Sequence, residues 1–313
     1  MFPPTFLHPV SFLASQEAMD HVWSPEESRA YTHWLATHHY ENFHVVSLLL
    51  PKRLHQNFYN VYSFCRWADD LGDEIADTAE SLRLLAWWRS ELQAMCAGHA
   101  RHPVFVALAS TAREFSLPLT LFDDLIKAFE QDQTVTRYRS FDELFQYCRY
   151  SANPVGRLVL GLCGYSDADR HTLSDATCTA LQLANFWQDV TVDLQKDRVY
   201  LPLDLLEAHK YSLESLFARK FDQRFRAAMQ EAVNITRELF LRGLPLADSV
   251  DRRLAIDLEL FSRGGLRVLQ KIERQDYDVL GSRPAISKLE RVGLLVSALT
   301  RRSFSRAAGS RAA

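Results

Sequence analysis

Helical periodicity recurs along nearly the whole of this 313-residue chain, and it limits the folds that the chain can adopt. Only 11 glycines and 11 prolines interrupt the pattern, and no stretch sustains the alternation of apolar and polar residues that strands show. We therefore predict an all-α protein. Helices are expected at Glu17–His39, Arg53–Glu74, Ser81–Ala97, Pro103–Glu114, Leu119–Thr134, Phe141–Leu162, Asp167–Leu194, Leu213–Leu241, Asp248–Arg274 and Pro284–Thr300.

The chain carries no internal mark of a domain boundary. It has no repeat, no low-complexity linker and no shift in composition, and 47% of its residues are hydrophobic, which is enough for a sizeable core. We predict one domain over residues 1–313. Residues 301–313 hold four arginines and no acid, which favours a flexible tail; a weak electrostatic tether to anionic lipid is the alternative.

The composition argues against several classes of protein. A net charge of −3 gives no electrostatic basis for binding nucleic acid. Five scattered cysteines without a Cys-x-x-Cys spacing fit a reducing compartment and give no zinc pattern. The N-terminus lacks the pattern of a secretory signal, and no run of about 18 apolar residues could span a membrane. We expect a cytoplasmic protein and keep open a peripheral contact with the inner face of the membrane.

Two aspartate pairs carry the chemistry. Asp69 and Asp73 are four residues apart in one expected helix, and Asp189 and Asp193 are four apart in another. This spacing places both carboxylates of a pair on one face, about one turn apart, where like charges weaken the helix. A compensating cation is expected, and a hard divalent metal with a phosphate-bearing substrate is the natural candidate.

Each aspartate pair belongs to a longer polar stripe at helical spacing. The first stripe is Tyr62, Arg66, Asp69 and Asp73, and the second is Gln182, Asn185, Asp189 and Asp193. The remaining faces of both helices are largely apolar, so the helices are expected to be buried on most sides. A polar stripe there must face a partner or a cavity, because unpaired buried carboxylates are costly. The alternative is two solvent-facing surfaces; the nearby acids Asp70, Glu74 and Asp77 are interpreted as supporting or solvated groups.

Two facing carboxylate pairs suit a small Mg²⁺ cluster that clamps a diphosphate and stabilises it as a leaving group. Arg66, Arg198 and Tyr200 can add donors to the phosphate. Departure of the diphosphate leaves a carbocation, so the rest of the cavity should be apolar and aromatic. Competing sites find little support, since the chain has no P-loop, no Gly-x-Gly-x-x-Gly after a strand and no Gly-x-Ser-x-Gly elbow.

At these residues the chain resembles the squalene/phytoene synthase family of trans-isoprenyl diphosphate enzymes, from about Tyr40 to Tyr277. The segments that carry the resemblance are Tyr62–Asp73, Asp132–Tyr138, Glu143–Cys148, Ala152–Gly156, Gln182–Asp193 and Asp197–Pro202. The resemblance implies the all-α isoprenoid synthase fold with a central apolar cavity. It also implies metal binding by Asp69, Asp73, Asp189 and Asp193.

The resemblance assigns further roles. It implies a diphosphate site lined by Arg66, Gln182, Asn185, Arg198, Tyr200 and Tyr277. It implies a prenyl cavity lined by Phe43, Tyr62, Val155, Gly156 and Leu183. Mg²⁺ is the expected cofactor, in more than one copy. No nicotinamide site is expected.

Four residues depart from the family members that condense two prenyl diphosphates: Glu41, Asn42, Asn153 and Gln188. Condensing members usually carry arginine where this chain has Gln188. These departures resemble a bacterial subgroup, the hydroxysqualene synthases of the hopanoid-type squalene pathway. A site that ionises a single diphosphate tolerates the loss of one positive charge, and the added polar groups can hold a water near the cation; helix capping or packing is the alternative for each.

Three hypotheses follow. The first is a lyase that ionises presqualene diphosphate, captures the rearranged cation with water and releases hydroxysqualene and diphosphate. The second is a head-to-head prenyltransferase that makes presqualene diphosphate, squalene or phytoene. The third is a non-catalytic assembly factor of the same fold, which would have no reason to keep four acids at metal spacing. Contact with a membrane and with pathway enzymes is compatible with the first two.

Overall fold

The structure is a computed structural model that describes residues 6–38 and 50–285. The chain divides into two compact units, and each is described by itself. Unit 1 comprises Met1–Val135 and Pro154–Ser166, and unit 2 comprises Thr136–Asn153 and Asp167–Ala313. The prediction of one domain over the whole chain stays a prediction.

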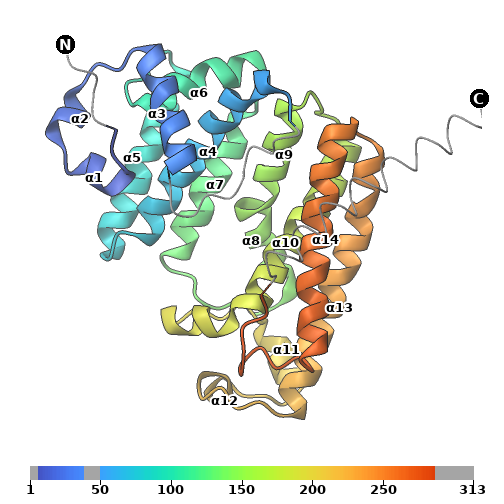
Figure 1. The fold of residues 1–313 in the computed structure, drawn as a ribbon. Helices are drawn as coiled ribbons and strands as arrows, with labels where there is room; N and C mark the ends of the chain where they lie inside the picture. The colour runs from blue at the N-terminus through green and yellow to red at the C-terminus, as the bar shows by residue number, and fades with distance from the viewer. Residues whose placement is uncertain (1–5, 39–49, 286–313) are drawn as a thin grey trace, which may run out of the picture. The chain divides into compact units, whose positions relative to one another are not determined.

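The described residues are helical in both units, as the periodicity predicted, and they contain no β-strand (Figure 1). The helices of unit 1 are α1 Pro9–Leu13, α2 Gln16–Asp20, α3 Pro25–His38, α4 Lys52–Asp73, α5 Thr78–Cys96, α6 Pro103–Glu114, α7 Leu119–Asp132 and α9 Asn153–Leu162. Only the first residue of α9, Asn153, belongs to unit 2. Those of unit 2 are α8 Phe141–Ser151, α10 Ala168–Asp193, η1 Leu194–Lys196, α11 Leu203–Ala208, α12 Leu213–Phe217, α13 Gln223–Gly243, η2 Leu244–Asp248 and α14 Arg252–Arg274.

Unit 1 is built around α4, which packs against α3, α5, α6 and α7. The core behind α4 is aromatic. The ring of Trp67 stacks on Trp88 with centroids 5.1 Å apart, and the buried imidazole of His102 meets Trp67 edge-on at 4.4 Å. The indole N–H of Trp67 donates to the Tyr31 hydroxyl at 3.0 Å. Because these large side chains are fully packed, one face of α4 is fixed and its polar stripe faces elsewhere.

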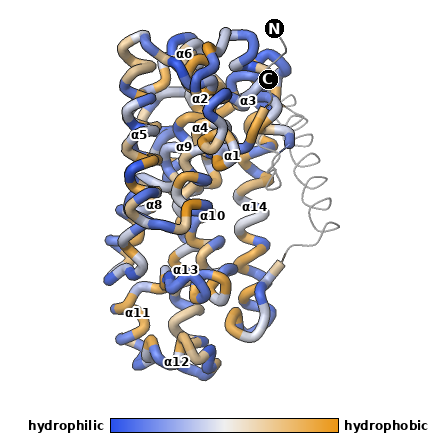
Figure 2. Tube along the Cα trace, turned by 90° about the vertical axis from the view of Figure 1, so that its left-hand side faces the viewer, coloured by the Kyte–Doolittle hydropathy of each residue, from blue (hydrophilic) through white to orange (hydrophobic). Residues whose placement is uncertain are grey.

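Unit 2 is built around α10, which lies along α13 and α14; the hydropathy colouring of Figure 2 shows apolar segments on all three. Trp187 of α10 is fully buried, and its indole N–H donates to the Thr236 hydroxyl of α13 at 2.7 Å. Gly243 makes this close packing possible, because a Cβ there would lie 2.1 Å from the Thr177 hydroxyl of α10.

Three helices predicted as continuous are each divided in two, and in each case local chemistry that competes with the helix explains the break. The predicted helix Glu17–His39 stops at Asp20 and restarts at Pro25, where the Ser24 and Glu27 side chains each accept the other residue's backbone N–H. This reciprocal capping box is a strong start signal, so it ends the preceding turn.

The predicted helix Phe141–Leu162 breaks at Ala152, because Pro154 lacks the N–H that a continuous helix needs there. The predicted helix Leu213–Leu241 breaks after Phe217, because Arg219 adopts a left-handed conformation and Asp222 caps α13. Helices α1 and α11 were not predicted. Most of the predicted helix Pro284–Thr300, and the predicted tail, lie outside the described residues.

None of the five cysteines forms a disulfide bond. No described helix combines the length and apolar character needed to cross a membrane.

Candidate functional site

The first aspartate pair lies on the last turns of α4 in unit 1. Arg66, on the same helix and almost fully buried, pairs with Asp69 at 3.0 Å and also with Asp70. Burial raises the pKa of Asp70, and the Arg66 charge acts in the opposite direction. Asp73 lies exposed at the helix end. The first motif therefore carries its cation within its own helix.

Two side chains hold the end of α4, and the sequence analysis gave neither a role. The Gln133 side-chain amide donates to the Gly72 carbonyl at 2.8 Å, and the Ser81 hydroxyl donates to the Leu71 carbonyl at 2.7 Å. Both carbonyls belong to the last turn, where no intrahelical partner is available. Gln133 lies in the middle segment of the resemblance, so its position was noticed, but its contact could not be predicted.

The second aspartate pair lies on the last turns of α10 in unit 2. Asp189 has 15% of its side chain exposed. The Oδ2 atom of Asp193 is buried and has no hydrogen-bond partner among the described residues. Burial, helped by the charge of Asp189, raises the pKa of Asp193 to about 7, against the opposing charges of Arg198, Lys196 and Arg283. The charged form of Asp193 is therefore disfavoured, chiefly because its carboxyl is buried.

A segment from the end of the described chain contacts this pair. The Arg283 guanidinium donates through Nε to Oδ1 of Asp189, and the Gln188 side-chain amide donates to the Pro284 carbonyl at 2.6 Å. Sequence reasoning missed Arg283, which is separated from Asp189 by 94 residues. Only its place shortly after Tyr277 could have pointed to it.

The chain turns sharply after the second pair and returns along it. Asp197 is left-handed with φ 54°, and the Arg198 backbone N–H donates to the Asp193 carbonyl at 2.9 Å. Asp197 also pairs with Arg137 at 2.6 Å. The Val199 N–H donates to the Thr136 carbonyl at 2.9 Å, within an isolated bridge. These contacts bring part of the middle segment of the resemblance beside the second motif.

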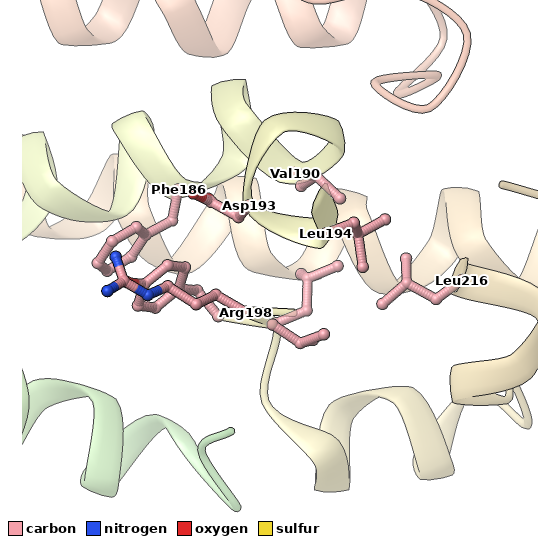
Figure 3. A pocket seen from close by; sticks show the side chains of 9 residues that line it. Phe186, Val190, Asp193, Leu194, Arg198 and Leu216 are labelled. Atoms are coloured by element: carbon pink, nitrogen blue, oxygen red, sulfur yellow. The ribbon is translucent and has the colours of Figure 1, made fainter. Parts of the chain in front are cut away.

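A small pocket, partly open to solvent, lies beside Asp193 (Figure 3). The Tyr200 ring stacks on Phe186 with centroids 3.6 Å apart and forms one side of it. The lining residues are Phe186, Val190, Asp193, Leu194, Arg198, Val199, Tyr200, Leu201 and Leu216. The pocket therefore combines an aromatic and aliphatic wall with one acid and one arginine.

The structure places the other predicted residues as follows. In unit 1, Tyr62 and Gly156 are half-buried and Val155 is exposed. In unit 2, Gln182 is half-buried, Asn185 is exposed, Leu183 is fully buried and Tyr277 lies half-buried in the turn after α14. The Asn153 side-chain oxygen accepts from the Thr179 hydroxyl at 3.0 Å, which is a packing contact. Glu41, Asn42 and Phe43 lie outside the described residues.

The donor set of the second motif fits a divalent cation. Two carboxylates one turn apart, one with a buried oxygen that has no hydrogen-bond partner in the described chain, supply the hard oxygen ligands that Mg²⁺ prefers. No cluster of three or more His, Cys, Asp or Glu side chains suited to a metal occurs among the described residues. A pair of carboxylates that leaves positions for water and substrate oxygens is the arrangement usual for Mg²⁺.

Comparison with known proteins places the chain in a family. The squalene/phytoene synthase profile matches residues 36–290, which is most of the chain. The chain belongs to the squalene/phytoene synthase family. Members of this family are enzymes of isoprenoid biosynthesis that act on prenyl diphosphates.

The curated relatives of this chain include proteins named for different activities. The chain is 34% identical to a hydroxysqualene synthase of Rhodopseudomonas palustris, over 86% of this chain and 92% of that protein. It is 30% identical to a phytoene synthase of Arthrospira platensis, over 78% of this chain and 83% of that protein.

A solved structure agrees with the predicted isoprenoid synthase fold. A squalene synthase of Alicyclobacillus acidocaldarius superposes with a TM-score of 0.78 at 42% identity, over 81% of this chain and 95% of that one. The all-α isoprenoid synthase fold is thereby confirmed.

Proposed function

We propose that this protein is a hydroxysqualene synthase: it ionises presqualene diphosphate, lets water capture the rearranged cation, and releases hydroxysqualene and diphosphate. The observation that carries the proposal is Gln188, an uncharged residue beside Asp189 where condensing members usually carry arginine. The hydroxysqualene synthases among the relatives, at 34% and 33% identity, support it.

The four aspartates Asp69, Asp73, Asp189 and Asp193 are proposed to hold Mg²⁺ in more than one copy. The buried Oδ2 atom of Asp193 has no hydrogen-bond partner among the described residues, and burial raises the pKa of that carboxyl. Both support the assignment, because a bound cation would stabilise the carboxylate there. Mg²⁺, when bound, supplies Lewis-acid stabilisation of the departing diphosphate.

The protein's own groups have three tasks in this proposal. Arg66 and Arg198 donate to the diphosphate, since a guanidinium matches phosphate oxygens in a two-pronged geometry. The polar side chains Gln182, Asn185, Tyr200 and Tyr277 complete the diphosphate site. Tyr62, Val155, Gly156, Leu183 and Phe43 are proposed to line the prenyl cavity, which excludes all but the capturing water.

Capture of the cation needs a polar group that positions a water. Glu41, Asn42 and Asn153 are the proposed candidates. The Asn153 oxygen accepts from Thr179, so its amide N–H groups and the second lone pair of that oxygen are left for this task. No step of the reaction consumes a reductant, so no nicotinamide cofactor is proposed.

The decisive assay supplies pure protein with presqualene diphosphate and Mg²⁺ and identifies the product. A C30 alcohol together with released diphosphate is expected. If the products contain no C30 alcohol, the proposal is wrong.

The second candidate is a head-to-head synthase that condenses two prenyl diphosphates. It is favoured by the relatives named phytoene synthase and by the 42% identity to a solved squalene synthase. Farnesyl or geranylgeranyl diphosphate as sole substrate separates the two, because only the second candidate consumes either one.

The proposed location is the cytoplasm, with a peripheral contact at the inner face of the membrane. A C30 diphosphate and its hydrocarbon-like product partition into lipid, which supports such a contact. Sedimentation of the protein with anionic vesicles tests it.

A further inference from the structure

Two consecutive residues of α10 hold two consecutive residues of the segment that follows α14. Gln188 donates to the Pro284 carbonyl at 2.6 Å, while Asp189 accepts from Arg283. The first contact joins a side chain to a backbone carbonyl, and the second joins two side chains. Together they attach this segment to the second motif at adjacent positions.

The segment arrives there along an ordered path. Asp276 and Tyr277 are left-handed, with φ 58° and 65°, and the Tyr277 N–H donates to the Ile272 carbonyl at 2.8 Å. The Gln275 amide then donates to the carbonyls of Asp278 and Ser282, at 2.8 and 3.0 Å. These contacts set the direction in which the chain reaches Arg283 and Pro284.

The two contacts differ in character. The Arg283 side chain is 52% exposed, so its ion pair with Asp189 is partly solvated and can be exchanged for another cation. The Gln188 contact goes to a backbone carbonyl and carries no charge. It therefore holds the position of the segment whether or not the guanidinium stays on Asp189.

We propose that Gln188 is a positioning residue that holds Arg283 at Asp189, and that Arg283 competes there with a divalent cation. The guanidinium takes one oxygen of Asp189 and offsets its charge, so a metal ion meets a weaker site while Arg283 remains. The pair thereby sets the metal affinity of the second motif. This inference rests on the proposed function, because that function assigns Mg²⁺ to Asp189.

In this proposal, Gln188 does more than remove a positive charge from position 188 of α10. Arginine at position 188 would place a permanent cation on α10 itself. Glutamine instead holds, through the Pro284 carbonyl, a separate segment whose own side chain Arg283 bears the cation. The residue that departs from the condensing pattern is thus also the one that holds the replaceable cation.

The test measures binding of Mn²⁺ alone to the full chain, from the electron paramagnetic resonance signal of free Mn²⁺. Arg283→Gln is expected to tighten binding about two- to fivefold, as expected for removing a half-exposed ion pair that competes with the metal. Arg283→Lys, which keeps the charge, should stay near wild type. Arg226→Gln is the matched control, because Arg226 pairs with Asp276 in the same turn at 2.5 Å and should leave the affinity unchanged.

Gln188→Leu tests the positioning role. It should tighten Mn²⁺ binding by up to about twofold when Arg283 is present and have no effect in the Arg283→Gln background, since both changes act through one guanidinium. Amide hydrogen exchange over residues 281–285 should also become faster in Gln188→Leu. A structural role alone would not produce this dependence on Arg283.

Three results separate the possible failures. Unchanged or weaker Mn²⁺ binding in Arg283→Gln, with binding still dependent on Asp189, overturns this inference alone. Independent, additive effects of the two variants overturn the positioning role of Gln188. If Asp189→Asn leaves Mn²⁺ binding unchanged in the otherwise wild-type chain, the metal assignment in the proposed function fails together with the inference.

Discussion

The two aspartate motifs share a local plan and differ in where their cation comes from. In each, a fully buried tryptophan stands two residues before the first aspartate, and its indole N–H donates to a hydroxyl of a neighbouring helix: Trp67 to Tyr31, and Trp187 to Thr236. In the first motif the counter-charge is Arg66, buried on the same helix. In the second it is Arg283, half exposed and borne by a distant segment. The fold therefore fixes the first cation and leaves the second replaceable.

The largest expected effect tests whether both motifs serve one reaction. Asp69→Asn and Asp189→Asn should each lower kcat by more than about a thousandfold, since each removes a charge to which the proposed function assigns metal binding in the transition state. Far-ultraviolet circular dichroism should stay unchanged, and Glu238→Gln, an exposed acid of α13, serves as the control. Full activity in either aspartate variant would remove that motif from the reaction.

The difference between the two cations should appear in stability. Arg66→Gln leaves the buried Asp70 without its partner and should lower the free energy of unfolding by about 3–5 kcal/mol. Arg283→Gln should cost less than about 1 kcal/mol, because that pair is half exposed. Urea denaturation measures both. Equal losses would contradict the distinction between a fixed and a replaceable cation.

The sequence predicted more of the helices than of their contacts. The range of α6 was predicted to the residue and that of α10 to within one residue at each end, because long periodic segments with clear breakers determine their own extent. The break before Pro25 depends on the capping box of Ser24 and Glu27, and the break at Asp222 depends on one capping side chain; a periodic pattern does not reveal the strength of either.

In the candidate site, too, the sequence predicts the residues on one helix face but not the contacts that they make. The aspartates could be proposed from spacing alone, since i, i+4 positions share a helix face. Arg283 and Gln133 could not, because each reaches its motif through tertiary contact from a distant segment. Gln188 was noticed for the charge it lacks, while its contact with Pro284 joins residues 96 apart in the chain, which no local pattern reveals.

The core behind the first motif contains a titratable group, which gives unit 1 a specific pH dependence. Burial among the tryptophans lowers the pKa of His102 to about 3, whereas in the unfolded chain its pKa is about 6.5. Between these values the unfolded chain binds the extra proton, so the contribution of His102 to stability is full well above pH 6.5 and is lost as the pH decreases. That contribution alone should fall by about 2 kcal/mol from pH 7 to pH 5, whereas the raised pKa of Asp193 acts in the opposite direction.

The His102 ring nitrogen Nδ1 accepts from the Val104 N–H and so caps α6; His102→Asn offers an amide oxygen in its place and removes the titration. The variant will be less stable overall through lost packing, but the difference in free energy of unfolding between wild type and variant should shrink by about 2 kcal/mol from pH 7 to pH 5. The same pH dependence in both proteins would show that His102 is not held neutral by its burial.

A further comparison concerns the hydrogen bonds of the two tryptophans. Tyr31→Phe and Thr236→Val each leave a buried indole N–H without its acceptor, and each should cost about 1–3 kcal/mol of unfolding free energy. The two losses should be similar, because both donors are fully buried. A negligible loss for one of them would show that the two motifs are not anchored by the same device.

The fate of the cation is the central claim, and isotope labelling tests it most directly. The protein, presqualene diphosphate and Mg²⁺ are incubated in water enriched in ¹⁸O, and the mass of the C30 product is measured by mass spectrometry. The account predicts an alcohol whose oxygen comes from the labelled water, with unlabelled diphosphate released. A C30 hydrocarbon without oxygen, or an alcohol that carries no label, would contradict capture of the cation by water.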